Sequence, residues 1–290
     1  MIRSQESAIV LPEDSAKTTQ ADASAAAYQS LLWEITSAAQ SHPSYLYGTI
    51  HIIPKDSFFL REGLEEKMAA SERLIMEMPL DLNVGTALTS MMHMMMPRGE
   101  SIQKYLSEEE YQQLTTFVKD SASAGLPIEM IRPFYTTQQI QLSYCMPGAT
   151  ESYEMVFSQE FKAAGKPIDG LETLKEQLKL VDDIPIEEQV TGLMSFVNQP
   201  QLSCEGLAEM IQLYRKQDLD GLMRLTTGEE EMSEEDLARF LDDRNARWIS
   251  KIEAFIKEES VFIAVGAGHL AGPKGVIELL REAGYTVRPL

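Results

Sequence analysis

Two histidines of this chain follow a glycine at the same spacing, one near each end of the sequence. They form the motifs Gly48-x-x-His51 and Gly266-x-x-His269, and they are two of the four histidines in the chain. A neutral imidazole binds divalent metals and exchanges protons near neutral pH. One such motif has little specificity, because glycine and histidine are common in loops. The pair, in matching contexts, predicts a single site built from both ends of the chain.

Each motif comes at the end of a short apolar run that is typical of a buried strand. Val261–Val265 leads into a Gly-Ala-Gly turn, and Tyr45–Ile50 contains Gly48 itself. In open α/β sheets, polar groups at the carboxyl ends of the strands form the crevice that binds ligands. We therefore expect the two strands to be neighbours in one sheet, with both histidines at the same edge.

A glutamate lies near the end of a third predicted strand, Arg73–Met78. A carboxylate in an apolar strand is costly unless it is paired, hydrogen-bonded or metal-bound. The alternative is an edge position from which Glu77 points to solvent. Two histidines and one carboxylate form the facial ligand set of open metal sites. His51, Glu77 and His269 are therefore candidate metal ligands, and Glu77 is alternatively the base that takes a proton from an activated water.

Arg244 and Asn245 lie in a polar stretch, DDRNAR, of the predicted amphipathic helix Ser233–Glu258. Both are candidate catalytic groups that would donate hydrogen bonds to the charge that develops on a substrate oxygen. Other catalytic classes lack their motifs, since the chain has no HExxH and no G-x-S-x-G. The glycines around His269 do not fit G-x-G-x-x-G either. The residues therefore favour metal-assisted hydrolysis.

Methionines crowd the segment Val84–Met96, which contains MMHMMMP. Thioethers around His93 are compatible with Cu(I), but clustered methionines more often form a deformable apolar surface. We favour the second interpretation. It predicts an apolar groove or mobile cover near the site, suited to an extended peptide or another apolar ligand and formed by Met91, Met92, Met94, Met95 and Met96.

The chain has 290 residues and a formal net charge of −20, with 44% hydrophobic and 24% charged residues. These proportions are ordinary for a soluble globular protein. The negative charge argues against nucleic acid as a partner, because nucleic-acid binding needs a basic surface. No run approaches the roughly 20 apolar residues that span a bilayer. Cys145 and Cys204 lack the close spacing of a zinc or redox pair, so we predict two buried thiols rather than a disulfide.

Residues 1–30 have no basic segment followed by an apolar core, so they are not an intact signal peptide. They are rich in Ala, Ser, Thr, Asp and Gln, which predicts a disordered leader. Such a leader would remain after removal of an export signal or lipid anchor. We favour an exported, cell-envelope protein, and a cytoplasmic protein with a disordered start is the alternative.

Strand patterns are concentrated at the two ends of the remaining chain. Residues 31–79 and 260–290 are expected to form a mixed central sheet that carries the site motifs. Residues 80–259 show mainly helical patterns, and we expect them to form a large block that covers the sheet. The predicted fold is a single α/β (α+β) domain over residues 31–290.

These segments resemble the TraB/GumN family, whose animal relatives include the Tiki metalloproteases and whose fold is related to the erythromycin-esterase and ChaN-like proteins. The resemblance rests on LLWEI…PSYLYGTIHI, RLIMEM, GLETLKEQ, DDRNARW and FIAVGAGHLAGPKGVIELLREAGYTV, and it extends from about residue 31 to residue 290. Carried over residue by residue, it implies ligands or catalytic groups at His51, Glu77 and His269, with Arg244 and Asn245 as a supporting pair. It implies second-tier positions at Glu172, Gly48 and Gly266.

The resemblance to the Tiki branch implies a metal-dependent peptidase that uses manganese, cobalt or zinc and acts on peptides or proteins. The alternative is a non-catalytic envelope protein in which the same histidines bind a peptide or haem-like ligand without turnover. Metal content measured together with peptide cleavage distinguishes the two functions.

Overall fold

The computed structural model describes residues 28–38, 40–79, 83–120, 125, 127–227 and 233–290. The leader predicted over residues 1–30 lies outside the described residues, apart from its last three. Of these, Tyr28 donates a hydrogen bond to Glu278, and Ser30 is buried. The chain is therefore anchored to the fold from residue 28 onward.

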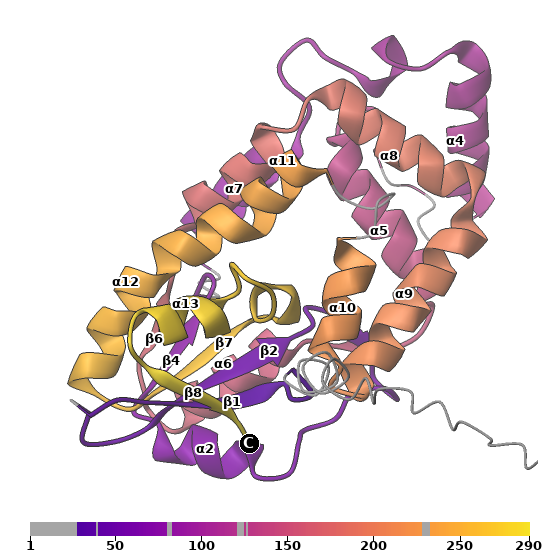
Figure 1. Ribbon diagram of the computed structural model, residues 1–290. Coiled ribbons are helices and arrows are strands. Elements are labelled where there is room, and N and C mark those ends of the chain that lie inside the picture. Colours follow the sequence, from indigo (N-terminus) through magenta and orange to yellow (C-terminus); the bar gives the residue numbers. More distant parts are fainter. Residues whose placement is uncertain (1–27, 39, 80–82, 121–124, 126, 228–232) are drawn as a thin grey trace, which may run out of the picture.

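A six-stranded mixed sheet forms the centre of the fold, as predicted (Figure 1). Its strand order is β6-β4-β7-β2-β1-β8, in which β6, β4, β7 and β2 run parallel and β1 is antiparallel to both of its neighbours. The strands are β1 (Leu32–Thr36), β2 (Ser44–Thr49), β4 (Arg73–Met76), β6 (Ile168–Gly170), β7 (Val261–Gly266) and β8 (Thr286–Pro289). Of these six strands, only β6 comes from residues 80–259, the region predicted to be mainly helical. Two further strands, β3 (Ile53–Pro54) and β5 (Thr150–Glu151), pair with each other in a small separate sheet.

The two strands that carry the Gly-x-x-His motifs are direct neighbours, which confirms the prediction. In the parallel pair β2–β7, Gly48 lies opposite Val265 and Thr49 opposite Gly266. On the other side of β7, Met76 of β4 lies opposite Ala264. All six residues of β2 and the first five of β7 are buried, because both faces of these central strands are covered. The carboxyl ends of β2, β7 and β4 therefore meet at one edge of the sheet.

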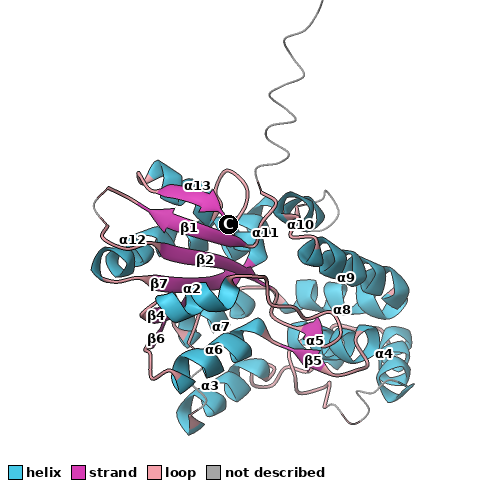
Figure 2. Ribbon diagram, turned by 90° about the horizontal axis from the view of Figure 1, so that it is seen from below, coloured by secondary structure: helices cyan, strands magenta, loops and turns pink. Residues whose placement is uncertain are grey.

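Helices cover both faces of this sheet (Figures 1 and 2). One face packs against α12 (Asp243–Glu258) and α13 (Val276–Glu282), and the other against α2 (Leu64–Ala70) and α6 (Tyr153–Ala163). Trp33, Tyr47, Phe157 and Phe262 are among the large side chains that fill these layers.

A second hydrophobic core lies within the helical block beside the sheet. It is formed mainly by α4 (Glu108–Asp120), α5 (Pro133–Cys145) and α8 (Ile186–Asn198), with Leu114, Ile140 and Leu193 fully buried. Ser107 and Glu110 form a capping box at the start of α4, because the backbone N–H of each residue donates a hydrogen bond to the side-chain oxygen of the other. The remaining helices are α3 (Val84–Met94), α7 (Leu174–Asp182), α9 (Pro200–Arg215), α10 (Leu219–Thr226) and α11 (Glu234–Leu237).

The prediction of two free thiols was wrong, because Cys145 and Cys204 form a disulfide. Cys145 ends α5 and Cys204 lies in the first turns of α9, and the two Cα atoms are 5.2 Å apart. The bond closes a loop with a sequence separation of 59 residues. Only the packing of α5 against α9 brings the two cysteines together, so their spacing in the sequence carried no sign of the bond.

The long helix predicted over Ser233–Glu258 is continuous but not uniform. Between α11 and α12 the backbone forms a π-helical turn, Ala238–Asp242. Such turns insert an extra residue into an α-helix and occur frequently at functional sites. Here the turn ends at Asp242, two positions before Arg244. No helix among the described residues is long and apolar enough to cross a membrane.

Candidate active site

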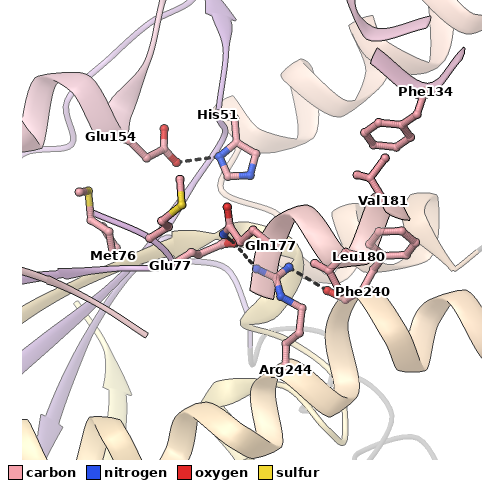
Figure 3. A pocket seen from close by; sticks show the side chains of 12 residues that line it. His51, Met76, Glu77, Phe134, Glu154, Gln177, Leu180, Val181, Phe240 and Arg244 are labelled. Atoms are coloured by element: carbon pink, nitrogen blue, oxygen red, sulfur yellow. Dashed lines mark hydrogen bonds and ion pairs between the residues drawn. The ribbon is translucent and has the colours of Figure 1, made fainter. Parts of the chain in front are cut away.

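A cavity of about 310 Å³ lies at the edge where β2, β4 and β7 end (Figure 3). Its floor and one wall come from the ends of the strands and from the start of α6, and the opposite wall comes from α5, α7 and the π-helical turn. The side chains that line it are His51, Met76, Glu77, Met78, Phe134, Glu154, Gln177, Leu180, Val181, Phe240, Arg244 and Ala264.

Glu77 is buried at the centre of this edge, so the alternative of a solvent-facing edge position was wrong. Its Oε1 accepts a hydrogen bond from the backbone N–H of Gly266 at 2.8 Å, and its Oε2 accepts one from Nη2 of Arg244 at 2.6 Å. Burial on its own would raise the pKa of this carboxyl. The positive charges around it and the Gly266 amide outweigh burial and hold the pKa below its ordinary value. Glu77 is therefore a carboxylate at neutral pH.

His269 is buried, and its contacts define which ring nitrogen carries the proton. Its Nδ1 lies 2.7 Å from Oδ1 of Asn245, whose own Nδ2 donates to the carbonyl of Lys274. Because that donation assigns Oδ1 as the acceptor, Nδ1 of His269 is the protonated nitrogen and Nε2 has a lone pair. Burial lowers the pKa of His269 to about 4, so the ring is neutral at pH 7.

The lone pair of His269 faces Arg244 and Glu77. Nη1 of Arg244 lies 3.1 Å from Nε2 of His269, and Oε1 of Glu77 lies 3.7 Å from the same atom. The His269 ring also lies 4.4 Å from that of Trp248, centroid to centroid, which fixes its plane. Asn245 thus positions His269, and its amide is not directed into the cavity.

Arg244 connects two buried glutamates. Its Nε and Nη2 each donate to Glu172 at 2.9 Å, in the bidentate geometry that favours arginine over lysine. Nη2 also reaches Glu77, and Nη1 donates to the carbonyl of Phe240 in the π-helical turn. Trp248 adds a further donor to Glu172. Glu172 therefore fixes Arg244, and all three nitrogens of Arg244 are in use within the protein.

His51 lies on the exposed side of the cavity, with 68% of its side chain accessible. Its Nδ1 is 2.9 Å from Oε1 of Glu154, which also accepts a hydrogen bond from Thr49. The hydrogen bond to Glu154 raises the pKa of His51 above its ordinary value. Figure 3 shows His51 beside Glu154, with its Nδ1 directed at that carboxylate and Glu77 below both. Its Nε2 is the nitrogen that remains for a ligand. Because the pKa of His51 is raised to about 9, the ring is charged at pH 7, and a metal would have to displace the Nε2 proton.

Because Gly266 has no side chain, it leaves a space next to Glu77, His269 and His51. A Cβ built at Gly266 would lie 3.2 Å from Oε1 of Glu77, 3.6 Å from Cδ2 of His269 and 3.9 Å from Nε2 of His51. Gly48 has a different role, because a Cβ there would lie 3.0–3.2 Å from atoms of Leu270 and Ala267. Gly48 therefore allows β2 to pack closely against the turn that presents His269, whereas Gly266 keeps the space between the ligand candidates open.

The methionines of α3 do not line this cavity, whose own methionines are Met76 and Met78. Met91 and Met92 are 59% and 66% exposed. Helix α3 packs against α7, which forms part of the cavity wall. His93 is paired with Asp182 of α7, with 2.7 Å between Nδ1 and Oδ2. The proposed groove role of the α3 methionines stays a prediction.

Sequence reasoning missed several residues of the site. The missed residues are Glu154 on α6, Gln177 on α7, and Phe134 and Phe240, which form part of the apolar wall of the cavity. Glu154 is separated from His51 by 103 residues, and no local pattern marks it. The contact of Trp248 with this site could have been predicted from the sequence, because Trp248 follows Arg244 by one helical turn and therefore lies on the same face of the helix.

The fold and these contacts agree with a family assignment. The model of the TraB/PrgY/gumN family matches residues 31–289, so the chain belongs to this family. Among its relatives, Metalloprotease TIKI2 of Danio rerio is 22% identical over 314 residues, and Metalloprotease TIKI1 of Homo sapiens is 25% identical over 318 residues. Both alignments cover 89% of this chain but only 60% and 61% of the relatives, so the chain spans about three fifths of their length. No solved structure matches the chain.

The names of these relatives raise the question of whether the site suits a metal. Three features favour it: two imidazoles with Nδ1 held by an outer oxygen acceptor, a carboxylate between them, and the space in front of Gly266. An outer acceptor on one ring nitrogen is the usual arrangement of a metal-bound histidine. No group of three or more His, Cys, Asp or Glu in the described part of the chain is yet close enough to hold an ion. The chemistry of these three donors fits a divalent metal, which would have to displace Nη1 of Arg244 from Nε2 of His269.

Proposed function

We propose that this protein is a metal-dependent hydrolase of the Tiki type, acting on peptides. One observation carries the proposal: Nε2 of His51, Oε1 of Glu77 and the ring edge of His269 (Cδ2) surround the space in front of Gly266, Nε2 of His269 lies 3.7 Å from the same Glu77 oxygen, and an outer acceptor holds Nδ1 of each histidine. Those are the requirements of an open metal site with two histidines and one carboxylate. The metalloprotease relatives support the same class of reaction.

In this proposal His51, Glu77 and His269 would hold the ion. A divalent metal in such a site lowers the pKa of a bound water towards neutrality and polarises a substrate carbonyl. Glu77 is held as a carboxylate by Gly266 and Arg244, so it is charged and available either as ligand or as acceptor of the water proton. Asn245 holds the proton of His269 on Nδ1, which leaves Nε2 of His269 unprotonated. Glu154 accepts a hydrogen bond from Nδ1 of His51, so Nε2 is the His51 nitrogen that would face the ion.

Arg244 is the candidate that faces the reacting carbonyl. It lines the cavity, and its Nη1 is the nitrogen not engaged by Glu172 or Glu77. When Nη1 releases His269, its N–H is available for the developing negative charge on the substrate oxygen. Glu172 meanwhile keeps the guanidinium in place through Nε and Nη2. The Phe134, Val181 and Phe240 wall opposite excludes water and contacts substrate side chains.

The disulfide supports the proposed place of action outside the cytoplasm. Structural disulfides form and persist in oxidising compartments and are rare in the cytosol. The Cys145–Cys204 bond joins the end of α5 to α9, and Phe134, at the start of the same α5, lines the cavity. An exported or cell-envelope location, with the chain oxidised, is the location that this bond favours.

The direct test is metal removal from the unmodified protein. We expect purified protein to bind about one Mn, Co or Zn ion per chain by elemental analysis and to cleave peptides from a mixed library. Chelation should abolish cleavage, and adding back one of these ions should restore it, because the ion supplies the nucleophile at neutral pH. Tight retention of a peptide or haem without metal and without cleavage would instead establish the binding-protein alternative.

Replacing Gly266 by alanine tests the space between the ligands. The new methyl group would lie 3.2 Å from Oε1 of Glu77 and would fill the space towards His51. Because displacement of a catalytic group by about 1 Å can cost roughly 10²-fold, we expect a loss of cleavage of about that size with the fold retained. Gly268→Ala is the matched control, since its Cβ would meet only Leu241, at 3.9 Å. Equal activity in both variants would contradict the proposed position of the ion.

A further inference from the structure

A second cavity adjoins the site. It has a volume of about 440 Å³ and lies between α5 and α8, next to the π-helical turn. Phe134 and Phe240 line this cavity and also line the cavity that contains Glu77 and Arg244. Figure 3 shows both rings on the side of the first cavity away from Glu154. A chain bound at the first cavity therefore has a neighbouring space to enter beyond these two rings.

The chemistry of the second cavity differs from that of the first. Its charged lining residues are Glu188 and Asp236, and no lysine or arginine is among the described residues that line it. Asp236 is partly neutralised by Arg239, at 3.5 Å, whereas Glu188 is exposed at the cavity. Phe134, Phe240 and Ile184 supply apolar surface. A long aliphatic side chain with a cationic end matches such a lining, because its stem packs on the rings and its charge faces the carboxylates.

We propose that this second cavity is a specificity subsite that receives a lysine or arginine side chain of the peptide substrate. The inference rests on the proposed peptidase function and deepens it, since it names Glu188 as a specificity-determining residue. The occupant is the substrate itself, because the cavity shares two lining residues with the site where the bond is cut.

The lining of α8 provides a way to block the subsite without disturbing the site. Gly192 lies in the middle of α8 and lines the second cavity, and a Cβ built on it meets nothing within 4 Å. Leucine at this position adds a side chain where there is room, and it replaces a poor helix former by a good one. Gly206 of α9 is equally open but does not line the cavity, so Gly206→Leu is a matched control.

The experiment uses labelled alanine-rich decapeptides in which either lysine or norleucine occupies one position, moved along the peptide. Norleucine retains an aliphatic stem but has no charge. Affinity is measured by fluorescence anisotropy with metal-free protein, and kcat/KM with metal-loaded protein, both at about 0.15 M salt to screen the general negative charge. In one register we expect lysine to be preferred about fivefold, the upper range for a partly exposed charge pair. Glu188→Gln should remove the preference, whereas Glu187→Gln, its neighbour outside the lining, should keep it.

Gly192→Leu should weaken binding of the lysine peptides about tenfold or more, while Gly206→Leu binds as the unmodified protein does. The subsite is refuted if no register prefers lysine, if both glutamine variants lose the preference equally, or if Gly192→Leu binds normally. Cleavage without any lysine preference refutes the subsite but not the peptidase. Lysine-selective binding without cleavage keeps the subsite and refutes the peptidase, and absence of both binding and cleavage refutes both.

Discussion

Alanine at His269 is expected to remove bound metal and peptide cleavage together. Nε2 of His269 is the buried imidazole nitrogen that faces Glu77 at 3.7 Å, and no other imidazole of the site is buried. The same result is expected for His51→Ala, and Glu77→Gln should lose cleavage whether Glu77 is ligand or base. The loss should exceed the roughly 10–100-fold that removal of an outer hydrogen-bond partner costs. Elemental analysis and a peptide-cleavage assay on the same preparations provide the measurement.

Two outer residues are the matched controls for these ligand variants. Glu154→Ala and Asn245→Ala each remove the acceptor on one Nδ1 but leave the imidazole in place. We expect both to bind metal more weakly, by about 10–100-fold, and to recover cleavage at high metal concentration. Normal metal content in both histidine variants would show that the ion binds elsewhere. Folded histidine variants that still cleave would exclude the mechanism.

Among the variants of the site, Arg244→Met is expected to lower the free energy of unfolding the most. Arg244 is the counter-charge of Glu77 and Glu172, which are only 8% and 5% exposed. Removing one partner of a buried ion pair leaves an uncompensated charge and typically costs about 3–5 kcal/mol. Urea denaturation of metal-free protein measures this free energy of unfolding. Cleavage should also fall by about 10²–10³-fold if Nη1 stabilises the substrate oxygen.

A second arginine on the same helix is the control for loss of a positive charge at an exposed position. Arg247 lies one turn along α12, is 53% exposed and reaches Glu172 only at 3.7 Å. Arg247→Met should therefore change the free energy of unfolding by no more than about 0.5 kcal/mol. Adding Glu172→Gln to Arg244→Met should recover part of the lost stability, because one buried negative charge is removed. If Arg244→Met were as stable as Arg247→Met, the buried ion-pair network would not be a stabilising feature.

Strand patterns at the two ends of the chain were enough to predict the centre of the fold. The apolar run before Gly266 and the run containing Gly48 are buried on both faces, and such strands belong at the middle of a sheet. Glu77 followed from the cost of placing a carboxylate at the end of a third such strand. Local pattern and tertiary position agree for these residues, so their adjacency could be predicted.

Pairings between the sheet and the helical block could not be predicted. The contacts of Glu154 with His51, and of Cys145 with Cys204, join residues 103 and 59 positions apart through the packing of helices. The role of Asn245 could not be predicted either. The sequence marks it as a polar donor next to Arg244, but neighbours on a helix point in directions about 100° apart. Arg244 consequently faces the cavity, whereas Asn245 faces His269 and the Lys274 carbonyl.

The position of β7 in the sheet has a consequence for the order in which the protein is made. This strand is encoded near the end of the chain, yet it pairs on one side with β2 and on the other with β4. Until the ribosome has released residues 261–266, β2 and β4 have no partner along these edges, and Glu77 lacks the Gly266 amide. Pairing over so long a sequence separation is slow and leaves exposed strand edges in the meantime. A chain that ends before residue 261 therefore has neither the continuous six-stranded sheet nor the Gly266 amide beside Glu77, so the proposed site forms only after β7 has been made.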